Sequence, residues 1–179
     1  LFNAVDSASR RAGCRFRVRG AAATGSGRKL VGPLIGADLV INEISAHVAG
    51  AVACDPAVET IFEIGGQDAK YMSVRDGRIV DANMNYVCAA GTGSFIEELA
   101  AKLGYRIEEI GPAAVGSTPP FTSSRCPVFM EQDILNLLQH GVTRREAAGA
   151  VMYSVIENYL ERVVGRRPVH AERVFFQGA

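Results

Sequence analysis

The sequence of 179 residues has no tryptophan, only 4 cysteines and no apolar run of membrane-spanning length. Its longest nearly continuous apolar stretch, residues 48–54, is far shorter than the roughly 20 residues that a membrane helix needs. The N-terminal region is interrupted by arginines and lacks the apolar core of a signal peptide. Four cysteines are too few for a disulfide scaffold in a chain of this length. We therefore expect a cytoplasmic protein with no membrane partner.

Neither sign of charge predominates. The chain has 19 Lys and Arg against 19 Asp and Glu, so its net charge is zero. Affinity for a polyanion depends on an excess of Lys and Arg, so we expect no nucleic-acid partner. Hydrophobic residues make up 48% and charged residues 21% of the chain, which is typical of a globular protein and argues against disorder.

Strand patterns alternate with helix patterns along the chain. Strands are expected over residues 15–23, 59–64 and 173–177, together with a hairpin whose strands 71–74 and 78–82 flank Asp76-Gly77. Helices are expected over residues 39–54, 89–103, 129–140 and 143–164, and residues 111–125 look like a loop. Asn42 is a plausible N-cap of the first helix, and Thr143 with Glu146 forms a capping box. This alternation predicts an α/β fold with a mixed sheet flanked by helices.

Two carboxylates flank a pair of glycines at the end of the 59–64 strand. Glu63 precedes Gly65 and Gly66, and Asp68 follows Gln67. Paired glycines let backbone N–H groups approach an anion, and a carboxylate beside them can hold Mg²⁺ directly or through water. The alternative is a strand that simply ends in a Gly-Gly turn. A second glycine-rich string, residues 24–28, is weaker evidence for phosphate contact because it lacks the end of a Walker A loop.

Two cysteines each stand shortly before an expected helix. Cys88 precedes the string Ala-Ala-Gly-Thr-Gly, which opens the 89–103 helix, and Cys126 lies in a polar stretch before the 129–140 helix. N–H groups at a helix start stabilise a thiolate or a phosphate. Two thiolates fill half of an iron–sulfur cluster, so a two-fold pair of chains could supply four. For each cysteine, the alternative is a buried small residue at a turn.

Taken together, these strings resemble the BadF/BadG/BcrA/BcrD ATPase family, the activators of 2-hydroxyacyl-CoA dehydratases and benzoyl-CoA reductases within the actin, sugar kinase and Hsp70 superfamily. The resemblance rests on residues 24–28, 42–47, 64–68, 83–85, 88–93 and Cys126. It implies actin-like (ribonuclease H-like) ATPase lobes, with the end of the first lobe at residues 1–58. The second lobe, residues 59–179, would carry the phosphate loop and both cluster cysteines.

The resemblance also implies the site. ATP would bind at Gly65, Gly66 and Gln67, with Gly91, Thr92 and Gly93 as further nucleotide-binding candidates, and Glu63 and Asp68 would be catalytic carboxylates beside Mg²⁺. Cys88 and Cys126 would each ligate one [4Fe-4S] cluster at the interface of a homodimer. The family implies an anaerobic activator that couples ATP hydrolysis to donation of a low-potential electron. The acceptor would be a 2-hydroxyacyl-CoA dehydratase or a related reductase component.

Two other functions stay open. One is a phosphotransferase of the same superfamily, such as a sugar or carboxylate kinase, in which both cysteines are incidental. The other is an Hsp70-like or actin-like module that uses nucleotide only as a switch, and we rank it last. Neither Cys14 nor Cys54 is assigned a functional role in any of these cases, and Cys54, at the end of an amphipathic helix, is expected to be buried.

Three features depart from the family pattern. The first phosphate loop is absent, the adenine-binding Gly-Gly motif is cut short at Gln177-Gly178-Ala179, and Glu63 stands where many superfamily members have Asp. The chain starts at Leu1 without Met and stops one residue into a turn. We therefore expect a fragment of a longer protein that hydrolyses ATP poorly by itself.

Overall fold

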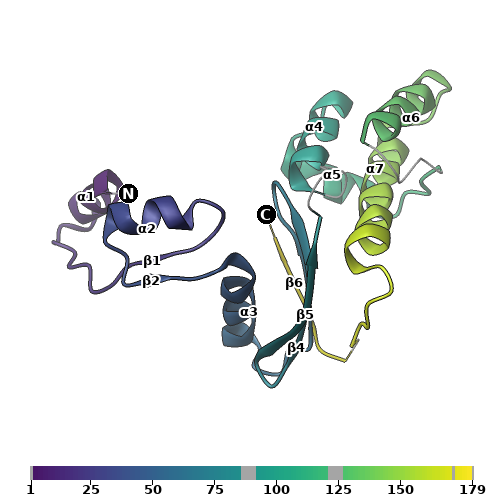
Figure 1. The fold of residues 1–179 in the computed structure, drawn as a ribbon. Helices are drawn as coiled ribbons and strands as arrows, with labels where there is room; N and C mark the ends of the chain where they lie inside the picture. The colour runs from purple at the N-terminus through teal and green to yellow at the C-terminus, as the bar shows by residue number, and fades with distance from the viewer. Residues whose placement is uncertain (1, 86–91, 121–126, 171, 179) are drawn as a thin grey trace. The chain divides into compact units, whose positions relative to one another are not determined.

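The computed structural model describes residues 2–85, 92–120, 127–170 and 172–178 (Figure 1). They form two compact units, Leu1–His47 and Val48–Ala179, and helix α3 (Glu43–Cys54) contains the boundary between them. The first unit contains, in order, α1 (Phe2–Ala12), β1 (Ala22–Ala23), α2 (Arg28–Ile35) and β2 (Leu39–Val40). No helix in the described part of the chain is long and apolar enough to cross a membrane.

The first unit contains a small β–α–β arrangement. β1 and β2 pair in parallel, and α2 connects them and packs on both. Gly32 of α2 is buried at this contact, where a Cβ would come within 2.8 Å of the Val40 side chain. A glycine is therefore needed for the close approach of helix and strand.

Two expectations for the first unit were wrong. The strand expected over residues 15–23 is reduced to Ala22–Ala23, and the side chains of Phe16 and Val18 are exposed. Alternation of apolar residues makes a strand only where a partner strand is available, and β2 is only two residues long. The helix expected over residues 39–54 begins at Glu43, because Asn42 caps it by accepting a 3.1 Å hydrogen bond from the N–H of Ser45.

The second unit contains a four-stranded mixed sheet, which confirms the predicted fold class. Its strands are β3 (Thr60–Ile64), β4 (Ala69–Arg75), β5 (Arg78–Met84) and β6 (Val174–Gly178), in the order β5-β4-β3-β6. β3, β4 and β5 are antiparallel neighbours, whereas β6 runs parallel to β3. Asp76 and Gly77 both have positive φ (50° and 71°), as a two-residue hairpin turn requires, so the predicted hairpin is confirmed.

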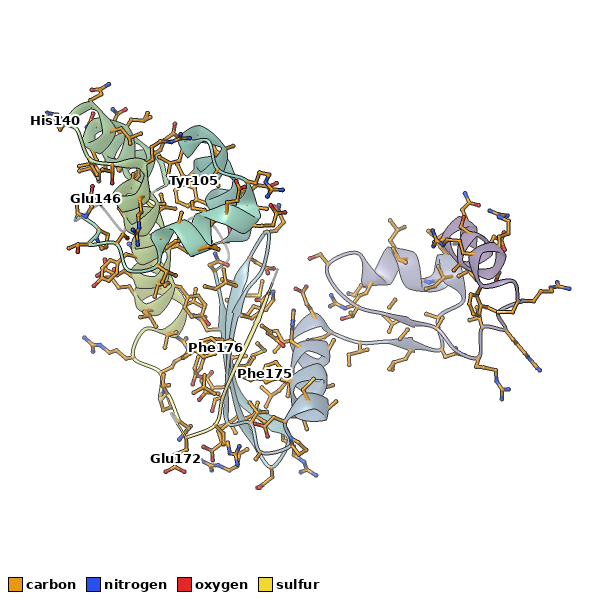
Figure 2. All side chains as sticks on the ribbon, turned by 180° about the vertical axis from the view of Figure 1, so that it is seen from behind. Tyr105, His140, Glu146, Glu172, Phe175 and Phe176 are labelled. Atoms are coloured by element: carbon orange, nitrogen blue, oxygen red, sulfur yellow. The ribbon has the colours of Figure 1, made fainter. Side chains whose placement is uncertain are left out.

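One face of this sheet packs against Tyr159, the last residue of helix α7 (Arg144–Tyr159). The ring of Phe62 on β3 lies 5.8 Å from that of Tyr159 and 5.5 Å from that of Phe176 on β6. Phe175 and Phe176 are neighbours on β6 (Figure 2) and so project to opposite faces. Glu63 and Lys70, which pair directly across β3 and β4, lie on the face opposite to Phe62.

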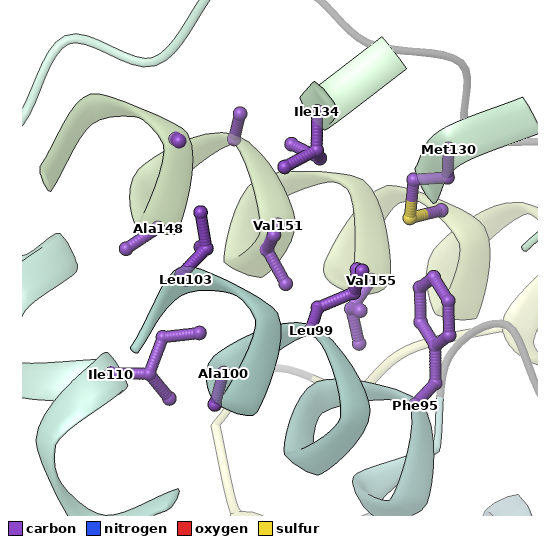
Figure 3. Close-up of a cluster of buried hydrophobic side chains, with 12 residues drawn as sticks. Phe95, Leu99, Ala100, Leu103, Ile110, Met130, Ile134, Ala148, Val151 and Val155 are labelled. Atoms are coloured by element: carbon purple, nitrogen blue, oxygen red, sulfur yellow. The ribbon is translucent and has the colours of Figure 1, made fainter. Parts of the chain in front are cut away.

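The helical part of the second unit is a bundle around α7 (Figure 1). Its members are α4 (Gly93–Leu103), α5 (Ile107–Ala114), α6 (Pro127–Gln139) and α7 (Arg144–Tyr159), and α7 contacts each of the other three. Their shared core is apolar and includes Phe95, Leu99, Ile110, Ile134 and Val151 (Figure 3). This core fixes the position of the start of α4, which contributes to the candidate site.

The predicted 143–164 helix is confirmed. The N–H of Glu146 donates to Thr143 Oγ1 at 3.2 Å and the N–H of Thr143 donates to Glu146 Oε2 at 3.0 Å, which closes the capping box. The helix continues without a break into a π-helical turn, η1 (Leu160–Val164).

Two further expectations need correction. The stretch expected to be a loop begins inside α5, which runs to Ala114 although it contains Pro112. Pro112 has no N–H and so donates no intrahelical hydrogen bond, but burial of Ile110 in the bundle core stabilises this short helix in spite of that loss. Cys54, expected in the core, is exposed at the end of α3. Cys14, which follows α1, is exposed as well.

Candidate functional site

A tight turn joins β3 to β4 and consists of Gly65, Gly66, Gln67 and Asp68. The N–H of Gly65 donates a 2.9 Å hydrogen bond to the carbonyl oxygen of Asp68, which closes the turn. A Cβ on Gly65 would lie 2.5 Å from Glu63 Oε1 and 3.1 Å from the carbonyl oxygen of Asp68, so the Glu63 side chain would have to shift to accept one. A Cβ on Gly66 would meet no described atom within 4 Å. The turn is thus closely packed at Gly65 and open at Gly66, and Gln67 is exposed.

A buried lysine lies between the two candidate carboxylates. Lys70 Nζ is 3.2 Å from Glu63 Oε2 and also contacts Asp68 Oδ1. Lys70 is 1% exposed and Glu63 is 3% exposed, whereas the side chain of Asp68 is 27% exposed. The site therefore combines two carboxylates with one ammonium, and Asp68 is its accessible acid. No role for Lys70 was predicted from the sequence. The signal that could have identified it is a charged residue among the otherwise apolar residues at the start of a strand.

The start of α4 is attached to this turn. The N–H of Gly93 donates to the carbonyl oxygen of Gly65 and that of Ser94 to the carbonyl oxygen of Gly66, both at 2.8 Å. A Cβ on Gly93 would lie 3.2 Å from the Gly65 oxygen, so glycine permits the contact. Thr92, the N-cap of α4, is fully buried. The structure thus places Thr92 and Gly93 beside Gly65 and Gly66.

A second attachment lies at the end of β5. The N–H of Asn85 donates to the carbonyl oxygen of Ala69 at 3.1 Å, and Asn85 Oδ1 accepts from the N–H of Ala69 at 2.7 Å. Asn83 Nδ2 donates to the carbonyl oxygen of Val163 at 2.8 Å. Asn85 therefore fixes the end of β5 to the start of β4, whereas Asn83 links β5 to η1.

Three predicted site residues, Cys88, Gly91 and Cys126, lie outside the described residues. α6 begins at Pro127, the residue directly after Cys126. Within the described ranges, no group of three or more His, Cys, Asp and Glu side chains is placed to hold a metal ion.

The chemistry of the turn fits a magnesium ion that is held together with phosphate. Carboxylate oxygens are preferred ligands of Mg²⁺, which usually binds through one or two carboxylates, several waters and substrate phosphates. Asp68 is accessible enough for this role, whereas Glu63 is buried against Lys70.

In the first unit, the other glycine-rich turn has Gly25 at a φ of 81°, and the Arg28 guanidinium donates to the carbonyl oxygen of Gly25 at 2.9 Å.

Comparison with known proteins identifies relatives along the whole chain. Residues 1–179 match the BadF/BadG/BcrA/BcrD ATPase family. The (R)-2-hydroxyglutaryl-CoA dehydratase activating ATPase of Acidaminococcus fermentans is 34% identical over 144 residues, which are 80% of this chain and 53% of the relative. The activator of lactoyl-CoA dehydratase of Anaerotignum propionicum is 40% identical over 122 residues, 66% of this chain and 47% of the relative. The chain spans about half the length of the curated relatives that it matches.

A solved structure matches the fold. The activator of 2-hydroxyisocaproyl-CoA dehydratase from Clostridium difficile, with bound ADPNP, aligns with a TM-score of 0.86 and 29% identity. The alignment covers 99% of this chain and 65% of that structure. The actin-like α/β fold, with its mixed sheet flanked by helices, is confirmed.

Proposed function

Because the chain belongs to the BadF/BadG/BcrA/BcrD ATPase family, we propose that it carries the phosphate site of an ATP-dependent activator of a 2-hydroxyacyl-CoA dehydratase or a related reductase. The observation that carries the proposal is the Gly65-Gly66 turn, which lies between Glu63 and Asp68 and is bonded to the start of α4. The names of the relatives, activators of CoA dehydratases, supply the class of acceptor.

In this proposal, the open side of the turn receives the phosphates of ATP. Gly66 leaves room for them, and the exposed Gln67 can donate from its side-chain amide. Magnesium, when bound, neutralises the charge that develops on the transferred phosphoryl group. Asp68 accepts hydrogen bonds from water beside the phosphates, and the buried Glu63 carboxylate pairs with the positive charge of Lys70. Gly91, Thr92 and Gly93 are further candidates for contacts with the nucleotide, and the N–H of Gly93 supports the turn through its bond to Gly65.

We further propose that Cys88 and Cys126 ligate a [4Fe-4S] cluster shared by the two chains of a homodimer, from which the electron passes to the acceptor. Two thiolates from each of two chains complete the four ligands. Support comes from the family and from the positions of the two helices, since α4 and α6 both begin within a few residues after a cysteine. A helix start stabilises the negative charge of a thiolate-ligated cluster.

The nucleotide proposal is tested by calorimetric titration of ATP into the wild-type chain and Gly66→Val. The branched side chain would fill the space left for phosphate, so we expect binding to be lost while the melting temperature is kept. Gly50→Val, at another open glycine, is the control. A folded Gly66→Val protein with unchanged ATP affinity would contradict the assignment.

The cluster proposal is tested by iron and sulfide analysis of protein purified without oxygen. Each chain of the dimer contributes two cysteines, so Cys88→Ala or Cys126→Ala alone removes two of four ligands and should eliminate both the cluster and the dimer. Cys14→Ala and Cys54→Ala, at exposed cysteines, should retain both. A colourless protein that phosphorylates a sugar or a carboxylate would instead support a phosphotransferase.

A further inference from the structure

We propose that Lys70 is the resident cation of the candidate site and prevents divalent cations from binding there without nucleotide. The inference rests on the proposed phosphate site and adds to it a rule for the order of binding. In that rule, the metal ion enters together with phosphate, because the space between the two carboxylates already holds an ammonium group.

The first observation is the geometry of the ion pairs. Glu63 and Lys70 face each other across β3 and β4, and Lys70 Nζ lies 3.2 Å from Glu63 Oε2. The same Nζ contacts Asp68 Oδ1. One ammonium thus joins the acids on the two sides of the Gly65-Gly66 turn, which are the groups that would hold a metal ion.

The second observation is that Lys70 is held in place. Its strand, β4, lies between β3 and β5, and its carbonyl oxygen accepts a 2.7 Å hydrogen bond from the buried hydroxyl of Tyr159. The preceding residue, Ala69, is bonded to the side chain of Asn85. The Lys70 side chain is 1% exposed. Moving the ammonium away from its acids would therefore leave charge buried without a partner, which is costly.

The consequence for metal binding follows from the needs of Mg²⁺. This ion requires near-octahedral oxygen coordination at about 2.0–2.1 Å and gives up its water reluctantly. Between Glu63 and Asp68 it would meet the repulsion of Lys70 at short range. Nucleotide phosphates add oxygen ligands and negative charge on the accessible side of Asp68, so the ion can bind there while Lys70 stays in place.

Lys102 provides a matched comparison. Its Nζ also lies between two acids, 2.8 Å from Glu98 Oε1 and 2.7 Å from Glu131 Oε1, but its side chain is 36% exposed. Water solvates those carboxylates when the lysine is removed. Removal of Lys102 should therefore create no cation site, whereas removal of Lys70 should leave the buried Glu63 carboxylate beside Asp68 without the ammonium between them.

The experiment measures binding of Mn²⁺ alone, without nucleotide, from the loss of the free-ion electron paramagnetic resonance signal. The wild-type chain and Lys102→Met should bind weakly, and Lys70→Met should bind about tenfold more tightly or better. Adding Glu63→Gln to Lys70→Met should remove the gain. Lys70→Arg, which keeps the charge, should behave like wild type.

Lys70→Gln is the second neutral variant, in case Lys70→Met does not fold. Unchanged Mn²⁺ affinity in a folded neutral variant would overturn the proposal. Tight binding of Mn²⁺ alone by the wild-type chain would do the same. A separate ATP titration distinguishes the two proposals: a wild-type chain that binds no ATP contradicts the phosphate site, whereas the Mn²⁺ comparison tests Lys70 without any nucleotide.

Discussion

The backbone N–H of Gly93 donates a 2.8 Å hydrogen bond to the carbonyl oxygen of Gly65, which joins the first residue of α4 to the turn after β3. The next residue, Ser94, makes the equivalent bond to Gly66. N–H groups at a helix start have no partner within the helix, and here two of them bond to the turn. The shape of the turn is therefore set by α4 as well as by its own glycines.

Alanine substitutions at the two glycines of this turn should have different effects on the free energy of unfolding. Gly65→Ala should lower the free energy of unfolding by about 1–3 kcal/mol, because its Cβ would lie 2.5 Å from Glu63 Oε1. Gly66→Ala should change it by less than about 0.5 kcal/mol, since its Cβ would meet no described atom within 4 Å. Urea denaturation measures both, and equal losses would contradict the difference in packing.

The local features of this fold were predictable from the sequence. The Asp76-Gly77 turn, the Thr143–Glu146 box and the Asn42 cap of α3 each act over a few neighbouring residues. Such short-range features can be predicted directly from the types of the residues that form them. The mixed sheet followed from the order of strand and helix patterns.

The remaining features depend on how the elements pair and pack. Glu63 and Asp68 lie only seven and two residues from Lys70, but the contacts among them depend on the register in which β3 pairs with β4, which residue types alone do not state. Phe16 and Val18 alternate like a strand but find no partner strand. Pro112 and Gly111 suggested a loop, whereas packing on α7 keeps them helical.

Tyr159 should make the protein sensitive to alkali. Burial raises the pKa of Tyr159 above its ordinary value of 10.0. A raised pKa contributes stability that is fully present below pH 10.0 and is lost as the pH rises further, because the unfolded chain ionises first. Tyr159→Phe should cost about 1 kcal/mol at neutral pH through loss of the hydrogen bond to the Lys70 carbonyl oxygen.

The check is the melting temperature as a function of pH. Above pH 10.0, Tyr159→Phe should lose stability less steeply than wild type. Tyr153→Phe, at a tyrosine that is 55% exposed, serves as the control and should follow the wild-type curve. Parallel curves for wild type and Tyr159→Phe would refute the burial of an un-ionised hydroxyl at this position.

Two helical glycines should respond to alanine in opposite directions. A Cβ on Gly149 of α7 would overlap Ser117 Oγ and lie 3.3 Å from Ser117 Cβ, so Gly149→Ala should destabilise by about 1–3 kcal/mol. Gly111→Ala in α5, where a Cβ would meet no described atom within 4 Å, should stabilise by up to about 1 kcal/mol. Chemical denaturation gives both values, and Ser117→Gly should restore much of the loss in Gly149→Ala.

The capping box of α7 should weaken in acid. The Thr143 hydroxyl, followed by the Thr143 backbone N–H, donates to the carboxylate and holds the pKa of Glu146 below its ordinary 4.5. A lowered pKa contributes stability that is present above pH 4.5 and is lost as the pH falls through the folded-state value. The melting temperatures of wild type and Glu146→Gln should therefore converge below pH 4.5. In a Thr143→Ala background, the two curves should already lie closer together at neutral pH.

The parallel pairing of β3 with β6 determines when the sheet can be completed during synthesis. Thr60 at the start of β3 bonds to His170 just before β6, and 110 residues separate them. At a translation rate of about 5–20 residues per second, the ribosome needs roughly 5–20 s to make the chain between them. During that interval the hairpin partners β4 and β5 are already available, but one edge of β3 is open to pairing with other chains. The newly made chain thus passes through a period in which protection by chaperones has the greatest effect on its yield.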